Sequence, residues 1–300
     1  MTALSYNQVI ANLADLPSLP AVVMELLNTI DQEDVDISVL AKKVSHDQAL
    51  TAKTLRMANS SMYGLQVKVT TIQQAITFLG FQSTRNLITA AAITGCFSEG
   101  ACQGFDDNAF WRHSIATAVC AKTLARQLRL NQDYAFTAGL LHDIGRLVLV
   151  ASFPQHYEKV IIYRAAHDCY LLEAERAVLG VDHIVAGLAL AEHWNFSDTI
   201  RLAIAGHHDP EASGAGFLAA IVHVADSIVH ALDLARVPDD LVPPVSTVAW
   251  SALGLSQDMY LQLFRETELH FEEISLVLMG RQGHPAQPSP VSTITSGTET

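Results

Sequence analysis

The sequence predicts an all-α protein. Apolar residues recur with a helical period along most of the chain, and no stretch longer than a few residues alternates as a β-strand does. Half of the 300 residues are hydrophobic and only 16% are charged, so an extensive core can form. We therefore expect a multi-helix bundle with an additional amino-terminal helical lobe.

Residues 1–105 are assigned to the amino-terminal lobe. Leu16-Pro-Ser-Leu-Pro20 breaks the chain and favours the start of a helix directly after it. Asp36 or Ser38 can cap the helix that includes Ile37 to Val44, and Asp47 can cap the next one. The helices expected in this lobe cover residues 5–13, 20–30, 37–44, 48–58, 71–79 and 83–97.

Residues 106–234 are assigned to a second lobe, whose first helix, near 108–128, begins after Asp106-Asp-Asn. Residues 235–280 should add two carboxy-terminal helices. Residues 281–300 are rich in Pro, Ser, Thr, Gln and Gly without an apolar period, which is typical of a disordered tail. The further helices expected cover residues 132–152, 154–168, 171–178, 182–194, 197–206, 216–234, 246–253 and 257–279.

The net charge of −13 argues against nucleic acid as a partner, since binding to phosphates needs a basic surface. Residues 37–58 could be interpreted as a helix-turn-helix. However, four cations on a small helical lobe are more typical of a solvated face than of a DNA-binding surface. These cations are Lys42, Lys43, Lys53 and Arg56.

The chain shows no sign of secretion or of membrane insertion. Its first residues lack the basic region and apolar core of a signal peptide. The apolar stretches around 86–97, 138–153 and 217–229 are too short or too interrupted to span a bilayer. The four cysteines form no C-x-x-C pair and are expected to be reduced thiols. We expect a cytoplasmic protein without membrane partners.

The chemically most informative feature is His142-Asp143, which lies inside the apolar run 138–150. A carboxylate in such surroundings is costly unless a cation or several donors compensate it. A bound metal ion is the simplest arrangement that satisfies both side chains. Ten of the thirteen histidines lie between residues 113 and 230, so the second lobe has many further candidate ligands.

Imidazoles and carboxylates together form the ligand set expected for iron, manganese, zinc or nickel. We expect one or two divalent ions, with Asp143 as the bridge and as a catalytic residue. Arg146 lies three residues further on the same helical face, where it can contact a phosphate oxygen. The first ion would be held by His113, His142 and Asp226, and the second by His183, His207 and His208.

Each assignment has a simpler alternative. His142 and Asp143 could form an internal hydrogen-bonded pair. The pair His207-His208 could merely end a helix, and His183 could merely begin one. His46-Asp47 looks similar to the central pair, but helix capping by Asp47 explains it. His223 and His230 could reach Asp226 from the same helix face, and we expect supporting or structural roles for both.

Several spaced motifs resemble the HDOD domain, a branch of the HD metal-dependent phosphohydrolase superfamily found in bacterial signalling proteins. The amino-terminal part agrees through Leu16–Pro20, Thr51–Ser60 and Ala75–Gly80. In the second lobe the resemblance is given by Phe110-Trp-Arg-His-Ser114, Gly139-Leu-Leu-His-Asp-Ile-Gly-Arg146, Gly180-Val-Asp-His183, Glu192-His-Trp194, Gly206-His-His-Asp-Pro210 and Val224-Ala-Asp226.

The resemblance implies an all-helical fold and a role in signal transduction. By similarity to the related HD-GYP proteins, which hydrolyse cyclic di-GMP, the seven histidines and aspartates named above occupy metal-ligand positions. This chain has Ala109 where those relatives have a glutamate, which argues against a third metal. Its loop Asp209–Phe217 lacks their Gly-Tyr-Pro motif, which argues against hydrolysis of cyclic di-GMP.

Two functions follow from these expectations. The first is a regulatory module that binds a signalling protein or a small phosphorylated ligand and holds metal at an HD-type site. The alternative is an active phosphohydrolase, a phosphodiesterase or nucleotide phosphohydrolase, that uses a di-metal centre with Asp143 and Arg146. The sequence leaves open whether copies of the chain associate into a homo-oligomer.

Overall fold

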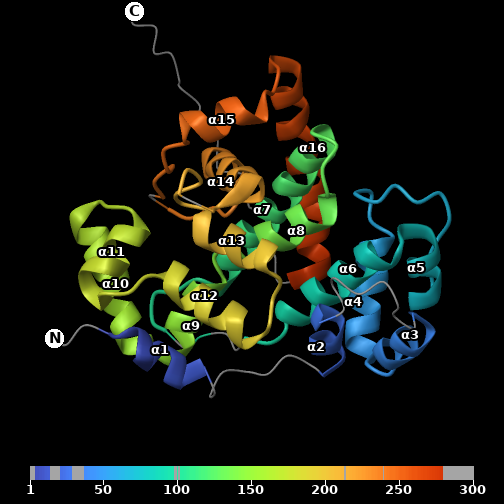
Figure 1. Cartoon of the computed structure of the whole chain (residues 1–300), viewed down its shortest axis with the longest axis horizontal. Coiled ribbons are helices and arrows are strands. Elements are labelled where there is room, and N and C mark those ends of the chain that lie inside the picture. The colour runs from blue at the N-terminus through green and yellow to red at the C-terminus, as the bar shows by residue number, and fades with distance from the viewer. Residues whose placement is uncertain are drawn as a thin grey trace, which may run out of the picture.

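The computed structural model describes residues 4–13, 21–28, 37–97, 100, 102–212, 214–238 and 240–279. These residues form helices α1 to α16 joined by turns and loops, with no strand among them, which confirms the predicted all-α class (Figure 1). The proposed turn at Leu16–Pro20 and the tail from 281 onward lie outside the described residues.

Helices α2 to α6 form the amino-terminal lobe, coloured from blue to cyan in Figure 1. Asp47 caps α4 as predicted, because its side chain accepts a hydrogen bond from the Leu50 amide at 2.9 Å. Thr71 caps α5 in the same way, and Gly80 with φ of 83° allows the sharp turn into α6. The helices are α2 (Ala21–Asn28), α3 (Ile37–Ser45), α4 (Gln48–Ala58), α5 (Ile72–Leu79) and α6 (Phe81–Ile93).

The centre of the second lobe is α7 (Asp107–Gln127), which is buried along nearly its whole length. It packs against α8 (Gln132–Leu141), α14 (Gly216–Ala231) and α16 (Gln257–Met279). A Cβ atom on Gly139 of α8 would lie 2.8 Å from the Cα of Ala118, so only glycine permits this close approach of α8 to α7. The two helices thereby bring His113 and His142 to neighbouring positions.

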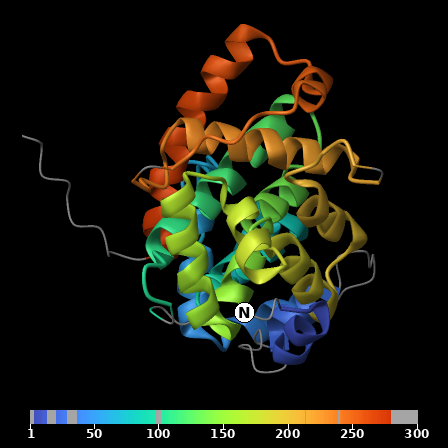
Figure 2. The ribbon, with the colours of Figure 1, turned by 90° about the vertical axis from the view of Figure 1, so that its left-hand side faces the viewer.

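The remaining helices of the second lobe surround this centre (Figure 2). They are α9 (Ile144–Ser152), α10 (Pro154–His167), α11 (Leu171–Leu179), α12 (His183–His193), α13 (Asp198–Gly206) and α15 (Thr247–Leu253). Among them, α12 packs on α9 and α13, and α10 forms a helical pair with α11.

Helix α1 (Tyr6–Leu13) does not pack with the other amino-terminal helices. It packs on α12 and α9 of the second lobe, and the Leu4 amide donates to the carbonyl oxygen of Leu179 at 2.6 Å. Helix α1 thus packs with helices of the second lobe, apart from α2 to α6. Val9 and Leu13 are the buried residues of this short amphipathic helix, and their burial holds α1 against the second lobe.

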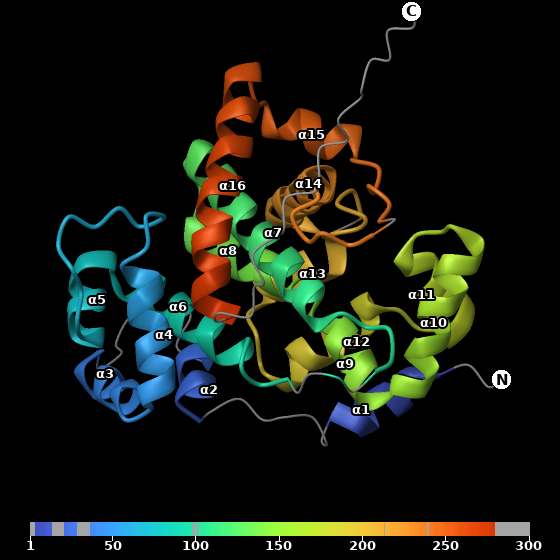
Figure 3. The same cartoon turned by 180° about the vertical axis from the view of Figure 1, so that it is seen from behind.

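The carboxy-terminal helix α16 is also integrated into the fold rather than forming a separate part. It packs along α7 and reaches α4, where the Ser61 amide donates to Glu273 at 2.8 Å (Figure 3). The apolar side chains of Leu263, Phe271 and Ile274 are buried in this contact. Helix α16 thus connects the two lobes.

The predicted helix over residues 132–152 is in fact two helices. α8 ends at Leu141, His142 and Asp143 form a turn, and α9 begins at Ile144. The apolar pattern runs through the turn because both helices are core helices. By length and composition alone the segment Gln132–Ser152 is long and apolar enough to cross a membrane, but 83% of its most apolar part is buried inside the fold.

Candidate metal centre

His142 and Asp143 lie at the turn between α8 and α9, and both are buried. The backbone changes direction at Asp143, where φ and ψ are −101° and 9°. His142 Nδ1 donates to the Gly139 carbonyl oxygen at 2.7 Å, which leaves Nε2 facing the interior of the site. The turn therefore directs an imidazole and a carboxylate into the same space.

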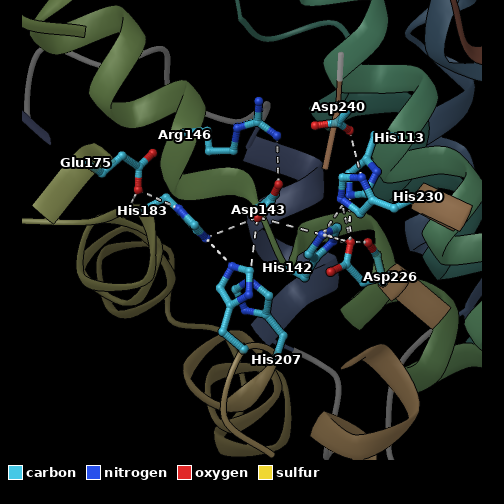
Figure 4. A network of polar contacts seen from close by, with 12 residues as sticks. His113, His142, Asp143, Arg146, Glu175, His183, His207, Asp226, His230 and Asp240 are labelled. Carbon is cyan, nitrogen blue, oxygen red and sulfur yellow. Dashed lines mark hydrogen bonds and ion pairs between the residues drawn. The ribbon is translucent and has the colours of Figure 1, made fainter. Parts of the chain in front are cut away.

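The first donor set consists of His113 from α7, His142 and Asp226 from α14 (Figure 4). His113 Nε2 lies 3.0 Å from Asp226 Oδ1 and 3.2 Å from His142 Nε2. His142 Nε2 is 3.7 Å from Oδ1 of both Asp226 and Asp143. Three separate helices thus bring these nitrogen and oxygen atoms together, and Asp226 points into the centre.

The second donor set consists of His183, His207 and His208. His183 begins α12, whereas His207 and His208 directly follow α13. Asp143 Oδ1 lies 3.3 Å from His183 Nε2 and 3.5 Å from His207 Nε2. His208 Nε2 lies 3.0 Å from His183 Nε2. Asp143 therefore stands between the two donor sets.

A close contact between α9 and α12 fixes the second donor set beside Asp143. A Cβ atom on Gly145 would lie 1.9 Å from the carbonyl oxygen of His183 and 2.4 Å from the amide nitrogen of Gly187. No side chain fits there, so the glycine two residues after Asp143 lets the start of α12 approach the turn.

Two carboxylates support the site, the buried Glu175 and the half-buried Asp240, and sequence reasoning missed both. Glu175 of α11 accepts from the His183 amide at 2.8 Å and from its Nδ1 at 2.6 Å. Asp240, in the loop after α14, contacts His230 Nδ1 at 2.7 Å and pairs with Arg164 of α10. Neither spacing follows a helical or motif rule, so only the contacts made in the fold reveal these two residues.

Two histidines expected to support the site have different environments. His223 Nδ1 contacts the His207 carbonyl oxygen at 2.7 Å, and its Nε2 accepts from the Ser246 amide at 2.8 Å. His223 therefore positions the backbone next to the second donor set. His230 Nε2 lies 3.4 Å from Asp226 Oδ1, at the edge of the first donor set. His46 is exposed and lies in the turn before α4, in the amino-terminal lobe.

Burial lowers the pKa of three histidines in the site, since it penalises the charged imidazolium. The pKa falls to about 4 for His113 and to about 2 for His208, and it also falls for His207. These imidazoles are neutral near pH 7 and can act as ligands. For His208 the neighbouring His207 and His183 add to the effect of burial.

The pKa values of the two aspartates, Asp143 and Asp226, are lowered although both side chains are buried. Burial acts to raise the pKa of Asp143, but nearby His142 and His183 outweigh it and hold the pKa well below its usual value. His230 and His113 do the same for Asp226. His183 has its pKa raised to about 9, because Glu175 and Asp143 outweigh burial. Both aspartates are thus ionised and surrounded by nitrogen donors.

The donor atoms fit a metal centre. Among the described residues, Asp143 groups with His183, His207 and His208, and it also groups with His113 and His142, with all ligand atoms in each group within 4.8 Å of one another. His207 Nε2 is buried and forms no closer contact among the described residues than the 3.5 Å to Asp143 Oδ1, without a regular hydrogen bond. Such an orphaned nitrogen is unfavourable unless something binds it. Histidine nitrogen and aspartate oxygen are the ligands that zinc, iron and manganese accept.

A cavity of about 700 Å³ opens over the two donor sets. Arg146 lies in its wall and donates from Nη1 to Asp143 Oδ2 at 2.9 Å. The Nε atom of Arg146 is buried and has no hydrogen-bond partner among the described residues. Phe105, Ile161 and Leu241 belong to the apolar part of the wall. The cavity can thus hold a small molecule with an anionic end and an apolar end.

The family model of the HDOD domain matches residues 16–210, which is more than half of the chain. The chain belongs to the HDOD family. The resemblance inferred from its motifs is therefore correct, and the match covers both the amino-terminal lobe and most of the site.

Solved structures agree with this HDOD assignment. An HDOD domain protein of unknown function from Geobacter sulfurreducens is 25% identical, with a TM-score of 0.74, and the alignment covers 91% of this chain and 96% of that one. A protein from Shewanella amazonensis SB2B, named "Putative phosphohydrolase", is 29% identical with a TM-score of 0.71, and the alignment covers 90% and 98% of the two chains.

A curated relative, an uncharacterized protein from Treponema pallidum (strain Nichols), is 24% identical over 274 residues. The match includes 88% of this chain and 45% of the relative. This HDOD chain thus spans a little under half the length of that relative.

Proposed function

We propose that this HDOD chain is a bacterial signal-transduction protein, a regulatory module whose second lobe holds one or two divalent metal ions. The observation that supports the proposal most strongly is the position of Asp143 between two complete donor sets. Its Oδ1 atom lies 3.7 Å from His142 Nε2 on one side and 3.3 Å from His183 Nε2 on the other. A carboxylate in this position can bridge two ions.

The residues divide between the two ions as follows. The first donor set would hold one ion, the second donor set would hold the other, and Asp143 would contact both. When bound, such ions lower the pKa of a water molecule between them and offset charge on a phosphoryl group. The histidine and aspartate ligands suit iron, manganese, zinc or nickel.

The cavity favours a small phosphorylated molecule as the ligand. Arg146 keeps one donor on Asp143, and its Nε has no hydrogen-bond partner in the part of the chain that the structure describes, so the guanidinium can also serve a phosphate oxygen. The apolar wall can contact the remainder of the ligand. Nucleic acid remains disfavoured as a general partner because of the net charge of −13.

A second function, hydrolysis of a phosphoester, is favoured by the same cavity because its opening leads to both donor sets. In this function Asp143 and the histidines would hold the reacting groups in place, and Arg146 would orient the phosphate. The likeness to a protein named as a phosphohydrolase supports this candidate. Cytoplasmic location, a protein partner and self-association stay predictions.

The experiment is an elemental analysis of the purified protein together with a hydrolysis screen over phosphomonoesters, phosphodiesters and nucleotides. Asp143→Asn preserves the size of the side chain and should lose most of the bound metal. His46→Ala is the matched control and should retain it, because His46 is exposed and distant from the site.

Each outcome has a distinct meaning. Metal with turnover that Asp143→Asn abolishes establishes the phosphohydrolase. Metal without turnover on any tested phosphoester supports the regulatory module. A wild-type protein that binds neither iron, manganese, zinc nor nickel would contradict both functions.

A further inference from the structure

His230 lies beside the first donor set. It is one helical turn after Asp226 on α14, so both side chains project from the same face. His230 Nε2 is 3.4 Å from Asp226 Oδ1, and the ring centroids of His230 and His113 are 4.6 Å apart. The side chain is 20% exposed and lines the cavity (Figure 4). Its Nε2 atom therefore faces the same space as the other donors.

The second ring nitrogen of His230 is held in the same way as that of His183. Asp240 contacts His230 Nδ1 at 2.7 Å, and Glu175 contacts His183 Nδ1 at 2.6 Å. A carboxylate on the distal nitrogen is the usual partner of a metal-ligating histidine, because it fixes both the tautomer and the orientation of the ring. Asp240 is itself anchored by Arg164 from α10.

His223 shows the contrasting arrangement on the same helix. Both of its ring nitrogens are bonded to backbone groups, those of His207 and Ser246. Neither nitrogen remains for a ligand, so His223 is a structural residue. His230 differs because only its Nδ1 has a partner outside the donor set, the Asp240 carboxylate. Its Nε2 faces the ionised carboxylate of Asp226 in the first donor set.

The distances are those of ligands to one ion. Bonds of about 2.0–2.2 Å from a metal to nitrogen and oxygen place neighbouring ligand atoms roughly 3 to 4 Å apart. Asp226 Oδ1 lies 3.0 Å from His113 Nε2 and 3.4 Å from His230 Nε2, and the three residues form a group that could hold an ion.

We propose that His230 is a further ligand of the ion held by the first donor set, and that Asp240 is the residue that orients it. The inference rests on the proposed metal centre and extends it by one ligand that the motif pattern does not include. It also gives a role to the loop after α14, since that loop supplies Asp240 next to the cavity.

The first test measures zinc affinity of the metal-free protein by competition with a chromophoric chelator. His230→Ala should weaken the zinc equivalent held by the first donor set at least tenfold and leave any zinc held by the second donor set unchanged. Asp240→Asn should weaken the same equivalent by about 10- to 100-fold, the usual effect of losing such a partner. His193→Ala is the matched control, because His193 is exposed at the end of α12, and it should bind zinc as the wild type does.

The second test is diffraction from zinc-loaded wild-type crystals, which does not depend on the folding of any variant. His230 Nε2 should lie about 2.0–2.1 Å from an ion. An ion on His113 and Asp226 with His230 Nε2 more than about 3 Å from it would overturn the inference, as would wild-type affinities in His230→Ala. In either case zinc binding by the wild type would leave the proposed function intact. A wild type that binds no metal would instead contradict the proposed function itself.

Discussion

Glu175 accepts two hydrogen bonds from His183, one from the backbone amide at 2.8 Å and one from Nδ1 at 2.6 Å, both on the same oxygen. Its other oxygen accepts from the Tyr157 hydroxyl at 2.9 Å. Glu175 is fully buried, so these bonds form away from water. One carboxylate thereby fixes the first residue of α12 and the direction of its imidazole.

We predict that Glu175→Gln weakens metal binding by the second donor set about tenfold or more. The amide cannot replace the charge that holds the His183 ring, and loss of such a partner costs roughly 10- to 100-fold in metal affinity. Metal titration of the metal-free protein measures the effect. Glu192→Gln, which changes an exposed carboxylate on α12, should leave the affinity unchanged. Equal affinities of both variants would show that Glu175 has no orienting role.

Gly145→Ala should destabilise the protein by about 1–3 kcal/mol and displace His183. The added methyl group would overlap the carbonyl oxygen of His183, so α9 and α12 must move apart. Urea unfolding gives the loss of stability, and metal content reports the displacement. Gly95→Ala is a suitable control, because a Cβ there meets its nearest neighbour at 3.5 Å. A Gly145→Ala protein as stable as that control would contradict the close contact.

Arg146→Lys should retain bound metal but bind inorganic phosphate about tenfold less tightly. Lysine keeps the charge, yet it lacks the planar set of donors that can serve Asp143 and a phosphate at once. Calorimetric titration of the metal-loaded protein with phosphate measures this change. Arg201→Lys, on α13 and paired with Asp198, provides the control. Unchanged phosphate affinity in Arg146→Lys would remove Arg146 from the proposed ligand contacts.

The metal-free protein should be most stable near pH 6.5 within the range from pH 4 to 8. The pKa of His113 is lowered to about 4 and that of His208 to about 2, both chiefly by burial. Below pH 6.5 the unfolded chain binds protons that these two folded imidazoles do not bind, so stability falls as the pH drops.

Above pH 6.5 the stability of the metal-free protein should fall again as the pH rises. The pKa of His183 is raised to about 9, because Glu175 and Asp143 outweigh the opposing effect of burial. Its contribution to stability is complete below pH 6.5 and is lost as the pH rises toward 9. Urea unfolding of chelator-treated protein at pH 5, 6.5 and 8 tests both limbs. A stability that rises steadily from pH 5 to 8 would disagree with the environment described for His183.

Most helices could be predicted from the sequence, because their apolar faces and caps are local signals. Asp47 and Asp106 each begin a helix as expected, and both accept a hydrogen bond from the amide three residues later. The turn at His142 was not predicted, because both flanking helices are buried and the apolar pattern does not change across it. The position of α1 depends on long-range packing that no local pattern encodes.

The sequence predicts the histidines and aspartates of the candidate site, but not Glu175 and Asp240, which hold two of the histidines in place. The motifs contain the seven expected donors, and the structure brings them into two neighbouring donor sets with Asp143 between them. Glu175 lies among charged residues on an amphipathic helix, where the sequence alone makes it look solvated. Asp240 lies two residues after Pro238 in a loop, which resembles an ordinary turn. Their contacts with the histidines of the site arise only when segments distant in the sequence meet.

The division of the apolar segment into α8 and α9 has a consequence for evolution of the chain. Asn131 caps the ten residues of α8, and His142 follows directly after them. Adding or deleting one residue in α8 would rotate the imidazole by about 100° around the helix axis. Gly145 would still anchor α9 against His183, so the two halves of the turn would no longer converge. The number of residues between the Asn131 cap and His142 should therefore tolerate change as little as His142 itself does.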